Sequence, residues 1–120
     1  MIWKLDRNRP ICPQICEQIC LEIAKGNLKP LEKIFSVRDV AVAAGVNPNT
    51  VQNSFNELER QGILYSVRGS GWYVTEDTTL AKNTIQNILR TKTASFFTEM
   101  EQLGMSLEAT KNYIKEWNYE

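Results

Sequence analysis

The stretch SVRDVAVAAGVNPNTVQNSFNELERQG, residues 36–62, contains the start and stop signals of two helices. Ser36, followed three positions later by an acidic residue, has the pattern of a capping box at a helix start. Gly45 suits the left-handed backbone of a tight turn. Asn47, followed at once by a proline, is a strong start signal for the second helix. Two helices joined in this way predict a helix-turn-helix.

The flanking segments extend this unit to a winged helix-turn-helix. Isoleucine recurs at every fourth position from Ile11 to Ile23, which predicts a helix over residues 11–25 with one apolar stripe. Residues 63–67 and 72–75 predict two strands around a glycine-containing turn, a small β-hairpin. We therefore expect a mainly α fold with a DNA-binding domain over residues 1–76, in which the first nine residues form a short extended arm.

Residues 77–120 predict a second part, a tail of two amphipathic helices separated at Gly104. Its apolar side chains exceed what a short helical hairpin can bury by itself. A second copy of the chain would cover them, so we expect a homodimer. The alternative is that they pack back on the first domain. The expected interface residues are Phe96, Phe97, Met100, Leu103, Tyr113, Ile114 and Trp117.

The composition bounds the classes of function. The 120 residues contain no histidine, the commonest general base and metal ligand. The sequence also lacks the glycine-rich and nucleophile motifs of common enzyme classes. We therefore predict no enzyme, no cofactor and no metal site. No apolar run is long enough to cross a membrane, and the first residues lack a signal-peptide pattern, so we expect a cytoplasmic protein with no membrane partner.

The start of the second helix in a helix-turn-helix meets base edges in the major groove. Here it carries short polar side chains, and Asn and Gln can pair with adenine. For Asn47 the role of helix N-cap is at least as well supported as a contact with a base, so both interpretations stay open. The formal net charge of +0 argues against DNA binding, although residues 1–38 are locally basic. The predicted contacts of this helix are Asn47, Asn49, Thr50 and Gln52.

An ordered set of motifs resembles the GntR family of bacterial regulators. The resemblance covers about residues 10–75. The short helical tail and the sequence of residues 47–52 are similar to those of the YtrA-type subgroup. The matching motifs are Pro10-Ile11, Gln14-Ile15, Gly26-x-Leu28-x-Pro30, Ser36-Val37-Arg38-Asp39-Val40-Ala41, Gly45-Val46-Asn47-Pro48-Asn49-Thr50-Val51, Leu58-Glu59, Gly62 and Gly69-x-Gly71-x-Tyr73-Val74.

The resemblance implies a transcription regulator, expected to be a repressor, that binds an inverted-repeat operator as a homodimer. It implies that Arg38 contacts a phosphate or a base and that the wing tip enters the minor groove. The further predicted DNA contacts are Ser36, Arg38, Arg68, Gly69 and Ser70. Leu31 and Phe35 depart from the family pattern, which usually has glycine and proline there. The sequence does not identify an effector.

Two alternatives stay open. The first concerns Cys12, Cys16 and Cys20, which follow one flank of the first helix. They could form a thiol-responsive or metal-responsive sensor, or they could be small buried apolar residues, as free cysteines usually are. Three cysteines on one helix cannot surround a tetrahedral zinc ion. The other alternative is a winged-helix module that binds protein instead of DNA. The neutral net charge favours it, and the arginines at the second helix and the wing argue against it.

Overall fold

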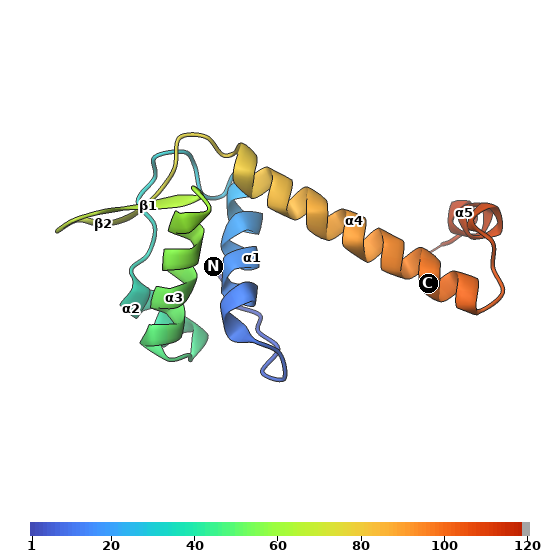
Figure 1. Cartoon of the computed structure of the whole chain (residues 1–120), viewed down its shortest axis with the longest axis horizontal. Helices are drawn as coiled ribbons and strands as arrows, with labels where there is room; N and C mark the ends of the chain where they lie inside the picture. Colours follow the sequence, from blue (N-terminus) through green and yellow to red (C-terminus); the bar gives the residue numbers. More distant parts are fainter. Residues whose placement is uncertain (119–120) are drawn as a thin grey trace. The chain divides into compact units, whose positions relative to one another are not determined.

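The computed structural model describes residues 1–118, and its element order matches a winged helix with a helical tail (Figure 1). The mainly α fold class with a small hairpin is confirmed. In the part described, the elements are α1 (Ile11–Ala24), α2 (Val37–Ala44), α3 (Pro48–Arg60), β1 (Leu64–Val67), β2 (Gly71–Val74), α4 (Thr79–Gln102) and α5 (Leu107–Lys115).

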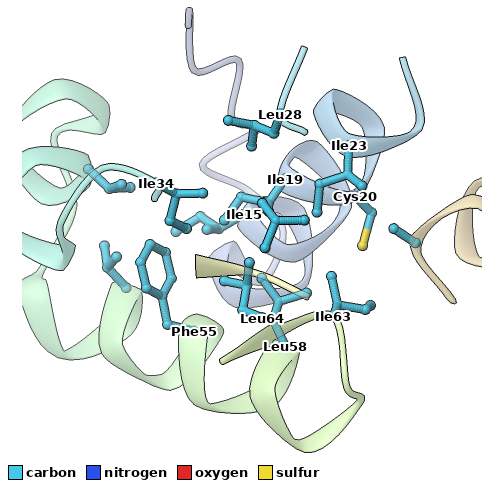
Figure 2. Packing of buried hydrophobic residues seen from close by; sticks show 14 of the residues in the cluster. Ile15, Ile19, Cys20, Ile23, Leu28, Ile34, Phe55, Leu58, Ile63 and Leu64 are labelled. Carbon is cyan, nitrogen blue, oxygen red and sulfur yellow. The ribbon is translucent and has the colours of Figure 1, made fainter. Parts of the chain in front are cut away.

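The core lies between α1, α3 and the hairpin (Figure 2). Ile15 and Ile19 of the predicted apolar stripe are fully buried, and they share one cluster with Phe55 and Leu58 of α3. Val74 of β2 is also fully buried. Burying a large apolar side chain contributes about 1.5–3 kcal/mol, so this cluster holds α3 at a fixed place on α1.

The helix-turn-helix has the local geometry that its capping signals predict. The Ser36 hydroxyl accepts a hydrogen bond from the Asp39 amide at 3.0 Å. Among residues 1–118, however, no bond returns from Asp39 to Ser36, so only half of the expected capping box forms. Gly45 closes α2 in the left-handed region, with φ 66° and ψ 42°. The Val46 amide then donates to the Ala41 carbonyl at 3.1 Å, which completes the turn.

A segment for which the sequence predicts only a connector, residues 31–34, pairs with the hairpin. β1 and β2 pair antiparallel, with Leu64 opposite Val74 and Val67 opposite Gly71. Lys33 forms an isolated bridge with Tyr73 on the other edge of β2. Residues 31–34 follow that edge through backbone bonds, among them Ile34 N–H to Trp72 O at 2.9 Å. The wing is therefore anchored on both sides of β2.

The N-terminal arm is fastened to α1 and is not simply extended. It ends in a turn, in which the Arg9 amide donates to the Asp6 carbonyl at 3.2 Å. The Asp6 carboxylate accepts hydrogen bonds from the Asn8 amide and the Arg9 guanidinium, which lower the pKa of Asp6. Nearer the start, Trp3 meets Phe35 edge-on, with ring centroids 5.8 Å apart. Phe35, which stands where the family pattern has proline, is therefore packed against the arm.

The chain forms two compact units, Met1–Ile85 and Gln86–Glu120. Their boundary falls inside α4, whereas the division predicted from the sequence lies after residue 76. In the first unit, Ala81 of α4 is buried in the core cluster. In the second, the Met105 amide donates to the Met100 carbonyl at 3.0 Å around a left-handed Gly104, which ends α4.

None of the helices within residues 1–118 combines the length and the apolar character that a membrane span requires.

Candidate nucleic-acid interface

The first half of α3 is polar and carries no charged side chain. Asn49 is exposed, and Thr50 and Gln52 are half-buried. The Gln52 amide nitrogen donates to the Asn56 side-chain oxygen at 2.9 Å, which orders both side chains along the helix. The first acidic residue of α3 is Glu57, more than two turns from the start. This end of α3 therefore offers hydrogen-bonding groups without a negative charge that would repel phosphate.

Asn47 serves as the N-cap of α3. Its side-chain oxygen accepts a hydrogen bond from the Asn49 amide at 2.8 Å. The Thr50 amide donates to the Asn47 backbone carbonyl at 3.0 Å, as expected for the first turn. The side-chain oxygen of Asn47 is thus used within the protein, while its amide nitrogen is not involved in this cap.

The start of α2 presents a cation beside an occupied cap. Arg38 is exposed, and the ion pairs within residues 1–118 are Arg9–Asp6 and Arg60–Glu57. Arg38 therefore has no carboxylate partner in the part of the chain described. The Ser36 hydroxyl next to it is engaged as an acceptor in the α2 cap. It keeps its own proton available for donation.

The wing tip, residues 68–70, joins β1 to β2 and is exposed. Gly69 has φ +79°, and a Cβ there would meet nothing within 4 Å, so glycine is needed for its backbone conformation and not for space. The Ser70 amide closes the turn on the Val67 carbonyl at 2.9 Å. Its hydroxyl forms a hydrogen bond with the Tyr73 hydroxyl. Arg68 is the cation of this tip.

Two contacts hold the wing from outside it, through Glu59 of α3 and through Lys33, and the sequence predicts neither. Both the amide and the hydroxyl of Ser66 in β1 donate to one carboxylate oxygen of Glu59, at 3.0 Å and 2.8 Å. Glu59 thereby ties the wing to the last turn of α3. Lys33 lies on the other edge of the wing, with its side chain against Gly71. Both contacts depend on tertiary packing, which spacing along the sequence does not reveal.

Two of the three cysteines of α1 have thiols withdrawn from solvent. The Cys16 thiol donates to the Ser54 carbonyl at 3.4 Å, and Cys20 is buried. Burial raises the pKa of Cys16 to about 12 and that of Cys20 to about 11. Both groups are therefore protonated thiols near neutral pH, and a thiol is a poor nucleophile and a poor metal ligand. Within residues 1–118, no group of three or more His, Cys, Asp or Glu side chains is arranged to hold a metal ion.

The second unit exposes much of its apolar surface. Leu103 is 79% exposed and Trp117 57% exposed, whereas Phe97 and Met100 are half-buried. Aromatic rings lie beside each other in two pairs, Phe96 with Phe97 and Tyr113 with Trp117. Leu107 is not among the predicted interface residues, and it is 54% exposed. The predicted interface residues that are exposed are Phe96, Leu103, Tyr113, Ile114 and Trp117.

Known proteins match both parts of the chain. The sequence profile described as "Bacterial regulatory proteins, gntR family" matches residues 13–74. The chain is 33% identical over 112 residues to the uncharacterized HTH-type transcriptional regulator YhcF of Bacillus subtilis, covering 93% of each protein. It is 36% identical over 109 residues to the HTH-type transcriptional repressor YtrA of the same organism, covering 89% of this chain and 83% of that one.

Solved structures agree with these matches. A GntR family transcriptional regulator from Listeria monocytogenes superposes with a TM-score of 0.83 at 36% identity, covering 95% of this chain and all of that one. The DNA-binding domain of AraR, in complex with its operator ORX1, superposes with a TM-score of 0.54 at 32% identity, covering 59% of this chain and 87% of that one. These relatives and neighbours are regulators of transcription, which confirms the prediction that the chain is not an enzyme.

Proposed function

Because the chain belongs to the GntR family of bacterial regulatory proteins, with relatives of the YtrA and YhcF type, we propose that it binds operator DNA as a homodimer. The start of α3 would lie in the major groove, and the wing would enter the minor groove. The observation that carries this proposal is that α3 begins with uncharged polar side chains, while the start of α2 and the wing tip each expose an arginine, Arg38 and Arg68.

The charges of the predicted contact residues support DNA over protein as the partner. Arg38 and Arg68 take part in neither ion pair of residues 1–118, so their charges are free to meet phosphate. Residues 1–38 hold seven Lys and Arg against four Asp and Glu. A small local excess of positive charge on a neutral chain gives a weak non-specific attraction, and base contacts must then supply more of the affinity.

The proposed dimer rests on the second unit. Its exposed aromatic and aliphatic side chains lie on both α4 and α5, where a second copy would bury them. In a two-fold symmetric dimer, two recognition helices meet half-sites about one helical turn of DNA apart, ~34 Å, or a multiple of it. The operator should then be an inverted repeat. We propose repression as the outcome, as in the relative named a transcriptional repressor.

The test is binding to DNA selected from a random pool, together with the DNA upstream of the gene, at about 50 mM and about 200 mM salt. Arg38→Ala and Arg68→Ala are compared with Arg60→Ala. Arg60 is a matched control because it removes the same charge from the last residue of α3, about 16 Å along the helix from Asn49. Arg38→Ala and Arg68→Ala should weaken binding and each lower the salt slope by about 1. Arg60→Ala should bind like the wild type.

Failure of the wild-type chain to enrich any DNA, or to bind at the lower salt, would contradict the proposal. The protein-binding alternative, which the neutral net charge favours, would then replace it. Capture of partners by wild-type protein but not by Arg38→Ala protein would be the next measurement in that case.

A further inference from the structure

An arginine of the N-terminal arm lies against the turn of the helix-turn-helix. One terminal nitrogen of Arg7, Nη2, donates to the Ala44 carbonyl at 2.6 Å, and the other, Nη1, donates to the Gly45 carbonyl at 3.2 Å. The bond to Ala44 is partly buried. The guanidinium also packs on Gly45, where a Cβ would lie 3.5 Å from Nη2. One side chain thus binds two successive carbonyls at the end of α2.

This end of α2 needs a cation that α2 does not supply. The last carbonyls of a helix have no partners within it and carry the negative end of the helix dipole, which a cation stabilises. The last turn of α2 contains no basic residue. Arg7, 37 positions earlier in the chain than Ala44, takes that role. A planar guanidinium suits this place because its donors are held in one fixed plane.

The arm presents Arg7 from a fixed position. The side-chain oxygen of Gln14 in α1 accepts from the Asp6 amide at 2.7 Å, and its nitrogen donates to the Asp6 carbonyl at 3.0 Å. The same nitrogen donates to the Pro10 carbonyl at 2.9 Å. The backbone on either side of Arg7 is thus tied to α1. The backbone from which the Arg7 side chain extends is therefore held on α1.

We propose that Arg7 is a positioning residue for DNA recognition, a latch that holds the turn at Ala44 and Gly45 and so aims the start of α3. The inference rests on the proposed function. The turn lies immediately before Asn47, so a displaced turn moves the residues that would meet base edges. Arg7 acts through the backbone of the turn, and not as a phosphate contact.

The experiment compares Arg7→Ala with Arg9→Ala in the full chain. The control removes the same charge from the same arm, and among residues 1–118 the Arg9 side chain bonds only the Asp6 carboxylate. The first readout is hydrogen exchange of the Val46 amide, which donates within the turn, against that of Ile19 in the middle of α1. The second is affinity for the selected DNA at two salt concentrations.

Arg7→Ala should speed exchange at Val46 and leave Ile19 unchanged. It should weaken operator binding about tenfold, equivalent to ~1.4 kcal/mol, with the salt slope of the wild type. Arg7→Lys should restore part of both, since an ammonium also donates to carbonyls. Arg9→Ala should change neither readout.

Three results would overturn the latch. The first is unchanged exchange at Val46 in Arg7→Ala. The second is equally faster exchange at Val46 and Ile19, which reports loss of global stability. The third is weaker binding with a salt slope lower by about 1, which identifies a phosphate contact. If the wild-type chain binds no DNA, the proposed function fails, and the exchange comparison still tests the latch by itself.

Discussion

Leu31 holds a backbone conformation that is costly for leucine. Its φ of 65° lies in the left-handed region, and its side chain is 54% exposed, so little packing compensates. Left-handed backbone costs an L-residue about 1–2 kcal/mol, whereas glycine adopts it freely. The Leu31 amide is kept there by its bond to the Val74 carbonyl at 2.9 Å, which places the connector on β2.

Leu31→Gly should therefore raise the free energy of unfolding by about 0.5–1 kcal/mol, after the greater flexibility of glycine in the unfolded chain is subtracted. Urea unfolding measures it. Lys29→Gly is the control, because Lys29 lies in the same connector without a positive φ, and it should lower the free energy. A free energy of unfolding lower than that of the wild type in Leu31→Gly would contradict the claim that the backbone at Leu31 is strained.

Asn47 allows capping to be separated from DNA contact. Asn47→Ala should lower the free energy of unfolding by about 1 kcal/mol, because the Asn49 amide loses its acceptor. Asn47→Asp should keep the stability, since Asp is an equally good N-cap, but it places a negative charge at the start of α3. We expect it to weaken DNA binding. Equal binding by Asn47→Asp and wild type would show that this position lies away from phosphate.

At the scale of elements, the wing depends on α3 through the Glu59 carboxylate. Glu59→Ala removes the acceptor of two hydrogen bonds from Ser66 and should lower the free energy of unfolding by about 1 kcal/mol. Glu59→Gln keeps a side-chain oxygen and should lose less. Glu76→Ala is the control, an exposed carboxylate without a hydrogen bond among residues 1–118. Equal stabilities of Glu59→Ala and Glu76→Ala would contradict a stabilising contact between Glu59 and the wing.

The thiols of α1 predict a loss of stability at alkaline pH. Burial raises the pKa of Cys16 to about 12 and of Cys20 to about 11, from an ordinary value of 9.0. Above pH 9.0 the unfolded chain releases these protons before the folded one does, so the free energy of unfolding falls. The contribution of the two protonated thiols to the free energy of unfolding is complete below pH 9.0. It is lost as the pH rises toward their folded-state pKa values of about 11 and about 12.

Urea unfolding at a series of pH values from 8 to 11 checks this prediction. The wild type should lose stability more steeply with pH than a chain carrying Cys16→Ala and Cys20→Ala, although the variant starts lower because it loses core packing. Parallel pH profiles would contradict it. Other titrating groups do not disturb the comparison, because both chains share them.

The elements that could be predicted from the sequence are those with local causes. The cap at Asn47, the glycine at position 45 and the isoleucine stripe of α1 act within a few residues, and the structure has each of them. The backbone bonds of residues 31–34 along β2 were not predicted, because β2 is not their neighbour in sequence. The contacts of Arg7 and Glu59 were not predicted for the same reason. Their partners are fixed only when α1, α2 and the wing are packed.

At the scale of the whole molecule, the second unit carries the prediction of a dimer. The wild-type chain should sediment at about twice its mass of 13.8 kDa. Leu103→Glu and Ile114→Glu change exposed side chains, so the monomer should fold, but each places a charge in the proposed interface. Both should sediment as monomers. Asn112→Glu, an exposed position on α5 with the same added charge, should remain a dimer.

A wild-type monomer at all concentrations would contradict the dimer, and so would Glu variants that still associate. The dimer is also coupled to function, because two linked recognition helices bind an inverted repeat far more tightly than one. The monomeric variants should therefore lose operator affinity without loss of folded structure.

The most direct test of the account is the affinity of the wild-type chain for its selected operator against a scrambled duplex of the same length and composition, at one fixed salt concentration. Sequence-specific regulators bind their sites about 10³-fold or more tightly than other DNA. We predict a ratio of that order, with one dimer on each operator. Equal affinity for the two duplexes would contradict sequence recognition by α3 and the wing.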